Sequence, residues 1–68
     1  GYDDVVIRGN PVERSFSCLY LRDGRLIAVD AINAPRDFVQ SKQLIANQVE
    51  IAADKLADSD VALKDLMT

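Results

Sequence analysis

The side chains that usually carry out enzymatic chemistry are scarce in this 68-residue chain. Cys18 is the single cysteine, and histidine, the commonest general base and metal ligand, is absent. Because no base is available to activate the thiol, we expect Cys18 to be a packing residue and not a nucleophile. The sequence also lacks a metal-ligand cluster and a phosphate-binding glycine loop. We therefore predict no catalytic, cofactor-binding or metal-binding residues in the chain itself.

Acidic side chains are more numerous than basic ones, but their spacing does not indicate a cation site. Asp3 and Asp4, like the group Asp54, Asp58 and Asp60, lack the glycine and ligand spacing of a calcium loop. We interpret them as solvated surface. The net charge of −3 argues against nonspecific binding of nucleic acid, and no apolar run is long enough to cross a membrane. With no signal-like N-terminus, the sequence predicts a cytoplasmic domain.

The strongest structural signal is the pair Asp23-Gly24 between two apolar runs, Phe16–Leu21 and Leu26–Ile32. Asp-Gly favours a two-residue β-hairpin turn, because both turn positions take a positive φ. Such a turn fixes the expected register. The facing pairs are Arg22/Arg25, Leu21/Leu26, Tyr20/Ile27, Leu19/Ala28, Cys18/Val29, Ser17/Asp30 and Phe16/Ala31. We expect Asp30 to have a structural role, through a cross-strand hydrogen bond with Ser17 or a contact with another domain, and favour this over a direct functional role.

Alternation along the two strands divides these pairs between two faces. One face carries Phe16, Cys18 and Tyr20, and we expect the helix that follows to cover it. Three leucines share the other face: Leu19, Leu21 and Leu26. A face in contact with water is normally polar, so these leucines require a second cover. That cover is either the C-terminal segment of the chain or the surface of another protein.

The remaining elements are predicted from shorter signals. Asp4–Arg8 indicates a strand that pairs antiparallel with Arg14–Arg22 and lies at an edge of the sheet, ended by Gly9-Asn10-Pro11. Asn33 is expected to cap a helix from about Ala34 to Ala46, with Pro35 in its first turn. The apolar stripe of this helix is predicted to contain Ala34, Phe38, Ile45, Ala46 and Val49.

Lys42 falls inside the predicted apolar stripe of this helix. We expect its stem to pack and its ammonium group to reach the helix edge, and a contact with a partner or an anionic ligand is the alternative. Beyond Val49 we expect a short extended piece at 49–51, a helical turn at 54–56 and a terminal helix at 61–67. The predicted fold is therefore α+β: an antiparallel three-stranded meander covered by one main helix, with short helical turns at the C-terminus.

Several stretches of the sequence carry a family resemblance. They are the hairpin R-S-F-S-x-L-Y-L-R-D-G-R-L-I-A-V-D-A, then I-N-A-P-R-D-F and K-Q-L-I-A, and finally K-L-A-D and L-K-D-L. In this order the chain resembles the C-terminal domain of FAD-dependent NADH:ferredoxin reductases of the putidaredoxin reductase and dioxygenase ferredoxin reductase type. The resemblance extends from about Tyr2 to Leu66.

The resemblance implies a parent protein with an FAD domain, an NAD domain and this third domain. In the family, NADH reduces FAD, the flavin passes single electrons to an iron–sulfur ferredoxin, and the C-terminal domain helps form the ferredoxin dock. The chain lacks both a G-x-G-x-x-G sequence and the strand that normally precedes Tyr2. We therefore interpret residues 1–68 as a single-domain fragment of the C-terminal domain. FAD and NAD(P)H belong to the parent, and the chain alone is not expected to be catalytic.

The resemblance implies a binding role for basic residues, because the ferredoxins of the family are acidic and opposite charges accelerate transient docking. Five candidates for contact with the ferredoxin follow: Arg22, Arg25, Arg36, Lys42 and Lys64. The alternative hypothesis is a free-standing module for protein interaction or self-association that uses the open sheet edge. An uncovered edge strand invites pairing with another chain, so we expect the isolated fragment to dimerise.

Overall fold

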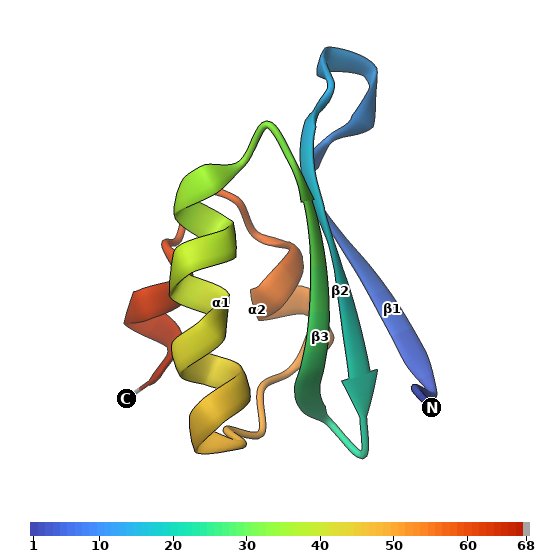
Figure 1. The fold of residues 1–68 in the computed structure, drawn as a ribbon, viewed down its shortest axis with the longest axis vertical. Helices are drawn as coiled ribbons and strands as arrows, with labels where there is room; N and C mark the ends of the chain where they lie inside the picture. Colours follow the sequence, from blue (N-terminus) through green and yellow to red (C-terminus); the bar gives the residue numbers. More distant parts are fainter. Residues whose placement is uncertain (68) are drawn as a thin grey trace.

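The computed structural model describes residues 1–67, which form an antiparallel sheet with all helices on one of its sides (Figure 1). The strands β1 (Asp4–Asn10), β2 (Ser15–Arg22) and β3 (Arg25–Ile32) lie in sequence order. Helix α1 spans Pro35–Asn47 and α2 spans Ala53–Ala57. Two 3-10 turns complete the fold, η1 at Pro11–Glu13 and η2 at Leu63–Met67. The predicted α+β meander with one main helix is confirmed.

The hairpin turn between β2 and β3 forms as predicted, but the register changes within β3. Asp23 and Gly24 have φ values of 53° and 78°, and Leu21 pairs with Leu26. Ile27 is then an extra residue, a β-bulge, because Tyr20 pairs with Ala28. From this point the predicted register is wrong by one residue. The observed pairs are Tyr20/Ala28, Leu19/Val29, Cys18/Asp30, Ser17/Ala31 and Phe16/Ile32.

The bulge has a packing reason. Leu26 is buried and Val29 packs against the core, although the two residues are separated by two others. A regular strand alternates faces at every residue and would point one of them away from the helices. The extra residue lets both side chains face the core.

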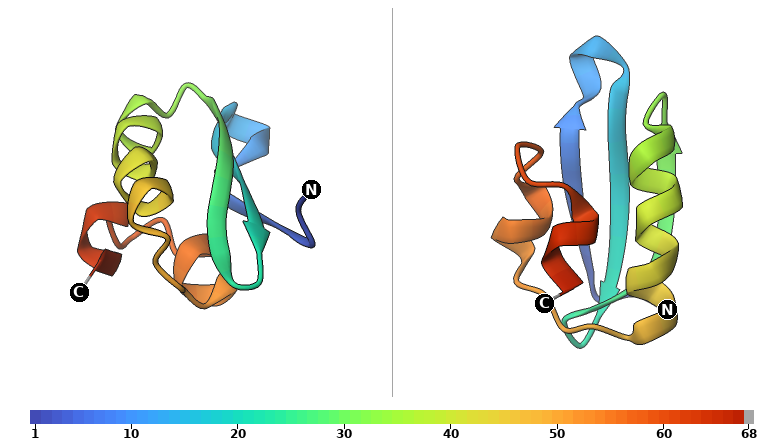
Figure 2. Two further views of the ribbon diagram at one scale, coloured as in Figure 1. Left: turned by 60° about the horizontal axis from the view of Figure 1, so that its bottom comes forward. Right: turned by 90° about the vertical axis from the view of Figure 1, so that its left-hand side faces the viewer.

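The helices cover the leucine face of the sheet, not the face that carries Phe16, Cys18 and Tyr20, so the predicted choice of face is wrong. Figure 2 shows α1, α2 and η2 on the same side of the sheet. Of the two covers left open for the leucines, the C-terminal segment is the one observed, because Leu56 and Leu63 are fully buried there; it lies beside α1 on the same face, not on the opposite one. The buried apolar residues are Val6, Leu19, Leu21, Leu26, Leu44, Ile51, Leu56 and Leu63.

Helix α1 is rotated about its axis relative to the predicted stripe. Its fully buried residues are Ser41 and Leu44, whereas the side chain of Phe38 is 42% exposed. The rotation follows from polar groups on the inner face of the sheet, where Arg8 and Ser17 are both buried. A helix that faces these groups presents polar residues of its own, so a purely apolar stripe does not mark its buried side.

The predicted N-cap of α1 is also wrong. Ala34 occupies the cap position, and Asn33 adopts a left-handed φ of 50°. Asn33 instead donates from Nδ2 to the Arg14 carbonyl over 2.9 Å, and its own carbonyl accepts a hydrogen bond from Ser15 Oγ over 3.1 Å. Asparagine tolerates the left-handed region better than most residues, so it suits this corner. Pro35 lies in the first turn of α1 as predicted.

The chain beyond α1 returns to the hairpin and then crosses the sheet. Glu50 forms an isolated bridge with Arg25, and the Ile51 N–H donates to the Gly24 carbonyl over 3.0 Å. The predicted extended piece near 50 and the helical turn at 54–56 are confirmed, and the predicted terminal helix is a 3-10 turn. Within residues 1–67, no helix is long and apolar enough to cross a membrane.

The sheet face turned away from the helices is largely apolar and open. Val5, Ile7 and Ile32 are 40%, 44% and 46% exposed there. Cys18, predicted to lie against the helix, is instead half-buried on this face beside Tyr20. Strand β1 is an edge strand as predicted, since it pairs with β2 alone among the described strands. The fold therefore leaves both a face and an edge uncovered by residues 1–67.

Candidate functional site

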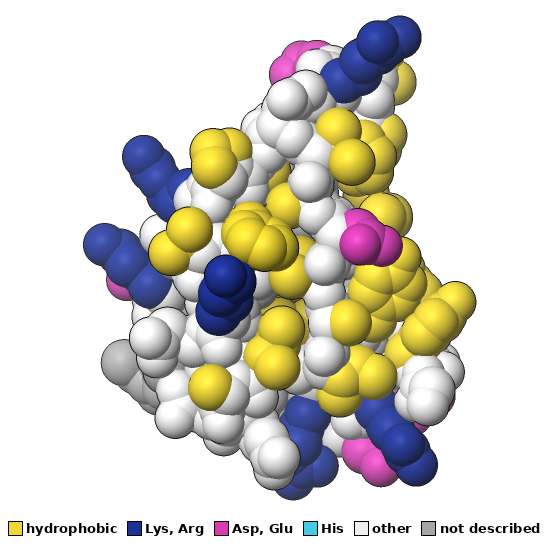
Figure 3. Space-filling model, in the orientation of Figure 1, with side chains coloured by type: hydrophobic (Ala, Val, Ile, Leu, Met, Phe, Trp, Pro, Cys, Tyr) yellow, Lys and Arg dark blue, Asp and Glu magenta, His cyan; other side chains and the backbone are white. Residues whose placement is uncertain are grey.

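The five basic residues predicted to contact a partner lie in two groups. In the first group, Arg22 and Arg25 flank the hairpin turn and line a shallow hollow together with Ile27 and Ile45. The hollow follows the line along which α1 packs on β3. Figure 3 shows hydrophobic side chains along this line, with Lys and Arg side chains beside them.

Lys42 belongs to the same group, because it lies on the α1 surface between Phe38 and Ile45. Residues three and four positions apart share one side of a helix. The Lys42 ammonium lies 4.6 Å from the centre of the Phe38 ring. Lys42 therefore lies outside the buried side of α1. The sequence pattern placed it inside the apolar stripe only because that stripe was assigned to the wrong side of the helix. We call this group the seam surface; its members are Arg22, Arg25, Ile27, Phe38, Lys42 and Ile45.

The second group consists of Arg36 and Lys64 on the other side of α1. The Lys64 N–H donates to Gln40 Oε1 over 3.1 Å, and Gln40 lies one helical turn after Arg36. Both basic residues are exposed where α1 packs on η2. We call this pair the α1–η2 edge.

The charges of the two groups differ in how far they are neutralised. Arg25 Nη2 lies 3.9 Å from Glu50 Oε2, and both side chains are well exposed, so this ion pair is weak. Among residues 1–67 the other four candidates form no ion pair. The contact between Lys42 and Phe38 holds one ammonium above an apolar surface and contributes about 0.5–1 kcal/mol at an exposed site.

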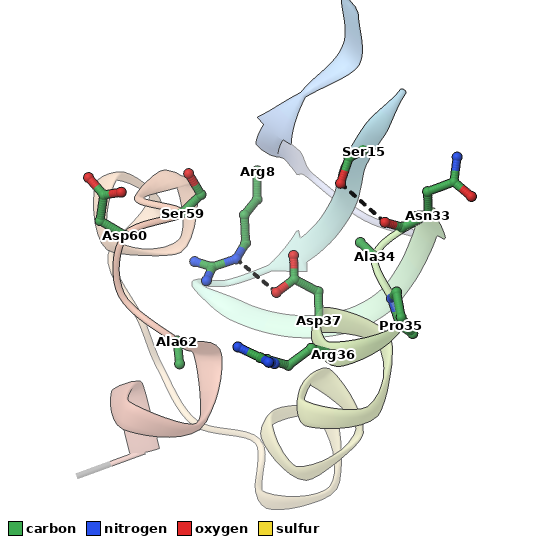
Figure 4. Close-up of a pocket in the computed structure, with 10 residues that line it drawn as sticks. All are labelled: Arg8, Ser15, Asn33, Ala34, Pro35, Arg36, Asp37, Ser59, Asp60 and Ala62. Atoms are coloured by element: carbon green, nitrogen blue, oxygen red, sulfur yellow. Dashed lines mark hydrogen bonds and ion pairs between the residues drawn. The ribbon is translucent and has the colours of Figure 1, made fainter. Parts of the chain in front are cut away.

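A buried arginine that the sequence analysis did not single out lies beside the α1–η2 edge (Figure 4). Arg8 is 2% exposed, and its Nε is 3.3 Å from Asp37 Oδ1. Asp37 also accepts a hydrogen bond from Ser17 Oγ over 3.1 Å. The strand alternation contained a usable signal, because Arg8 lies two residues after Val6 and so on the same face.

The Arg8 guanidinium also donates to three backbone carbonyls of the C-terminal segment. Nη1 contacts Leu56 O over 3.2 Å and Asp58 O over 2.8 Å, and Nη2 contacts Val61 O. All three guanidinium nitrogens therefore have partners. In the described part of the chain, no buried side-chain nitrogen or oxygen lacks a hydrogen bond.

The open sheet face carries a polar contact of its own. The Tyr20 hydroxyl donates to Asp30 Oδ2 over 2.8 Å, and this hydrogen bond raises the pKa of Tyr20 above 10.0, with smaller contributions from desolvation and from the Asp30 charge. The predicted contact between Asp30 and Ser17 is wrong, because the bulge places Asp30 opposite Cys18. The Tyr2 ring lies 4.9 Å from the Tyr20 ring.

The two glycines of the meander do not lie in a phosphate-binding loop. Gly9 lies near the end of β1 and Gly24 in the hairpin turn, so neither belongs to a loop that runs from a strand into a helix N-terminus. Among residues 1–67, no group of three His, Cys, Asp or Glu side chains is placed to hold a metal.

These features define a small α+β domain that has its helices on one side of an antiparallel sheet and an open apolar face on the other. Residues 1–67 match the family model described as "Reductase C-terminal", and the chain belongs to this family. The resemblance to the C-terminal domain of ferredoxin reductases of the putidaredoxin reductase type is thereby confirmed.

Similar proteins support the same assignment. The chain is 43% identical over 96% of its length to the ferredoxin reductase subunit of 5,5'-dehydrodivanillate O-demethylase from a Sphingobium species. It is 39% identical over 98% of its length to putidaredoxin reductase from Pseudomonas putida. A crystal structure of the covalent putidaredoxin reductase–putidaredoxin complex matches 98% of the chain with a TM-score of 0.88 and 39% identity. The chain spans 16% of the length of these relatives.

Proposed function

We propose that this chain is the C-terminal structural and docking domain of an FAD-dependent NAD(P)H:ferredoxin reductase. The parent passes electrons from NAD(P)H through FAD to an iron–sulfur ferredoxin, and this domain supplies part of the surface on which the ferredoxin docks. The observation that carries the proposal is the match of nearly the whole chain to a reductase solved together with its redox partner. The FAD and NAD domains of the parent hold both cofactors, and a cytoplasmic location belongs to the same proposal.

The two basic groups supply the docking chemistry. Lys42 and Arg25 stand beside the exposed apolar side chains of Ile27 and Phe38 on the seam surface. An apolar centre with charged groups at its rim is typical of a transient protein interface. Positive rim charges attract an acidic partner from a distance and then leave it free to dissociate, which suits a carrier that must bind and depart in each cycle.

The test is charge removal in the full-length reductase. One variant combines Arg22→Ala, Arg25→Ala and Lys42→Ala, and the other combines Arg36→Ala and Lys64→Ala. Each exposed charge contributes about 0.2–1 kcal/mol, so the triple variant should lower kcat/KM for ferredoxin roughly three- to hundredfold at low ionic strength. The loss should shrink as salt is added, because screening already weakens these charges.

Two controls separate docking from damage to the fold. Arg14→Ala removes a basic residue that follows η1 and belongs to neither group; η1 lies at the tip of the meander (Figure 1). Turnover with a small artificial electron acceptor should be unchanged in every variant, because such an acceptor does not use the protein surface. The docking proposal is wrong if neither multiple variant changes kcat/KM for ferredoxin.

A second candidate function is self-association through β1. The supporting observation is the edge of β1 that no residue among 1–67 pairs with, beside an open apolar face on which Val5 and Ile7 are 40% and 44% exposed. Sedimentation velocity of the 68-residue chain should then show a concentration-dependent dimer. Ile7→Lys places a charge on the open face and should return the chain to a monomer. A wild-type chain that stays monomeric at all concentrations removes this candidate.

A further inference from the structure

Arg8 joins two segments that are far apart in the sequence. On one side it pairs with Asp37, in the first turn of α1. On the other side it donates to the carbonyls of Leu56, Asp58 and Val61, which span the end of α2 and the loop before η2. Figure 4 shows the guanidinium between the start of α1 and this loop.

The loop between α2 and η2 has few other polar ties to the rest of the molecule. Its own hydrogen bonds are local: the Val61 N–H donates to Asp58 O over 3.2 Å, and the Asp60 N–H donates to Asp58 Oδ1 over 3.0 Å. These bonds shape the loop without attaching it to the sheet. The Arg8 guanidinium makes that attachment with three donors in a fixed planar fork.

The two joined segments are those that carry the α1–η2 edge. Arg36 precedes Asp37 in the first turn of α1, and Lys64 follows Val61 by three residues. One tie between these segments is direct, since the Lys64 N–H donates to Gln40 Oε1 over 3.1 Å, and Arg8 adds the tie between the preceding loop and the first turn of α1. Release of the loop would therefore leave Lys64 held to α1 by a single hydrogen bond.

We propose that Arg8 is the positioning residue of the α1–η2 edge. By bridging Asp37 and the loop carbonyls, it fixes Arg36 and Lys64 in one arrangement that an acidic protein partner can match. This inference rests on the proposed docking function. It adds a buried residue that touches no partner and yet sets the charge pattern that the partner meets.

Arg8→Lys in the full-length reductase is the central test. Lysine keeps the positive charge and most of the stem, but its ammonium cannot reproduce the planar fork that reaches Asp37 and three carbonyls together. Amide hydrogen exchange in residues 57–64 should become faster while exchange in β2 stays slow. The KM for ferredoxin should rise roughly two- to thirtyfold, the range of couplings carried by residues that contact neither ligand. Turnover with a small electron acceptor should stay at the wild-type value.

Asp37→Asn provides a second variant in case Arg8→Lys does not fold. It removes the charge at the other end of the bridge and should produce the same local exchange pattern. Ser41→Ala is the matched control, because Ser41 is fully buried but its hydroxyl donates to Phe38 O within its own helix. Ser41→Ala should leave both loop exchange and KM near the wild-type values.

The outcomes divide cleanly. Exchange that is unchanged in residues 57–64, or that rises equally in β2, overturns the positioning role. The positioning role is also overturned if Arg8→Lys speeds exchange in the loop but leaves the KM for ferredoxin unchanged, while the Arg36→Ala/Lys64→Ala variant raises that KM. If the Arg36→Ala/Lys64→Ala variant leaves the KM for ferredoxin unchanged, the α1–η2 edge is not a docking site. Arg8 then cannot position one. The exchange data then still decide whether Arg8 fixes the loop.

Discussion

Replacing Leu44 by alanine tests which side of α1 faces the sheet. Leu44 is 0% exposed and belongs to the apolar core, whereas Phe38, predicted from the helical pattern to be the buried anchor, is 42% exposed. Truncation of a fully buried leucine costs about 2–5 kcal/mol. A core in a domain of this size supplies about 3–5 kcal/mol in total. Leu44→Ala should therefore bring the chain close to its unfolding midpoint in plain buffer.

Phe38→Ala should cost less, although phenylalanine is the larger side chain. Full burial of such a side chain is worth about 1.5–3 kcal/mol, and roughly half of that applies to Phe38. Loss of the contact with Lys42 adds about 0.5–1 kcal/mol. Val39→Ala is the matched control on the same helix, because Val39 is 63% exposed. The expected order of destabilisation is Leu44, then Phe38, then Val39.

Urea unfolding, followed by far-UV circular dichroism and tyrosine fluorescence, measures these differences. Trimethylamine N-oxide in the buffer gives the weakest variant a folded baseline, since excluded osmolytes favour the compact state. The reasoning is refuted if Phe38→Ala destabilises the chain as much as Leu44→Ala does. That result would mean that α1 is rotated as the apolar stripe predicted, with the Phe38 side against the sheet.

Three further substitutions test the two positive-φ glycines and the open face. A Cβ on Gly9 would lie 2.6 Å from a backbone carbonyl oxygen of β2, whereas one on Gly24 would lie 3.1 Å from a flexible side chain; both glycines have a positive φ. In urea titrations, Gly9→Ala should therefore destabilise the chain by at least about 1 kcal/mol more than Gly24→Ala, and equal losses would contradict the close approach. Asp30→Ala should lower the pKa of Tyr20 toward 10.0, measured by phenolate absorbance in a Tyr2→Phe background. Because the folded-state pKa is above the unfolded value, the stabilisation is complete below pH 10 and is lost as pH rises through the raised pKa; an unchanged pKa in Asp30→Ala would show that the hydrogen bond does not cause the shift.

The sequence predicted those elements that are encoded by neighbouring residues. The Asp23-Gly24 turn and the start of α1 at Pro35 depend on local backbone preferences, and both are present; β1 ends before Pro11 as expected, although it includes Gly9 and Asn10. The choice of face failed because it depends on a contact between distant residues. The inner side of the sheet includes Arg8 and Ser17, and a pattern that assigns polar residues to solvent places them outside.

The sequence predicted which residue types form the candidate site, but not how the folded chain groups them. Residue type was enough to name five basic candidates, but their division between the seam surface and the α1–η2 edge depends on how η2 packs on α1. The hydrogen bond from Lys64 to Gln40 that unites the edge spans 24 residues. No local pattern carries that information, and the same is true of the Arg8 network, whose contacts reach as far as Val61.

The bulge at Ile27 also bears on how this domain tolerates changes in length. Leu26 and Val29 face the core on either side of the bulge, while Ile27 has no partner on β2. Deletion of Ile27 would leave Leu26 opposite Leu21 and Ala28 opposite Tyr20, so every later residue of β3 would keep its partner and its face. A deletion elsewhere in β3 would instead exchange the two faces for the rest of the strand. Position 27 is therefore the one place in β3 where a single residue can be lost without exchanging the faces of the strand, and a family member without the bulge should align with a one-residue gap there.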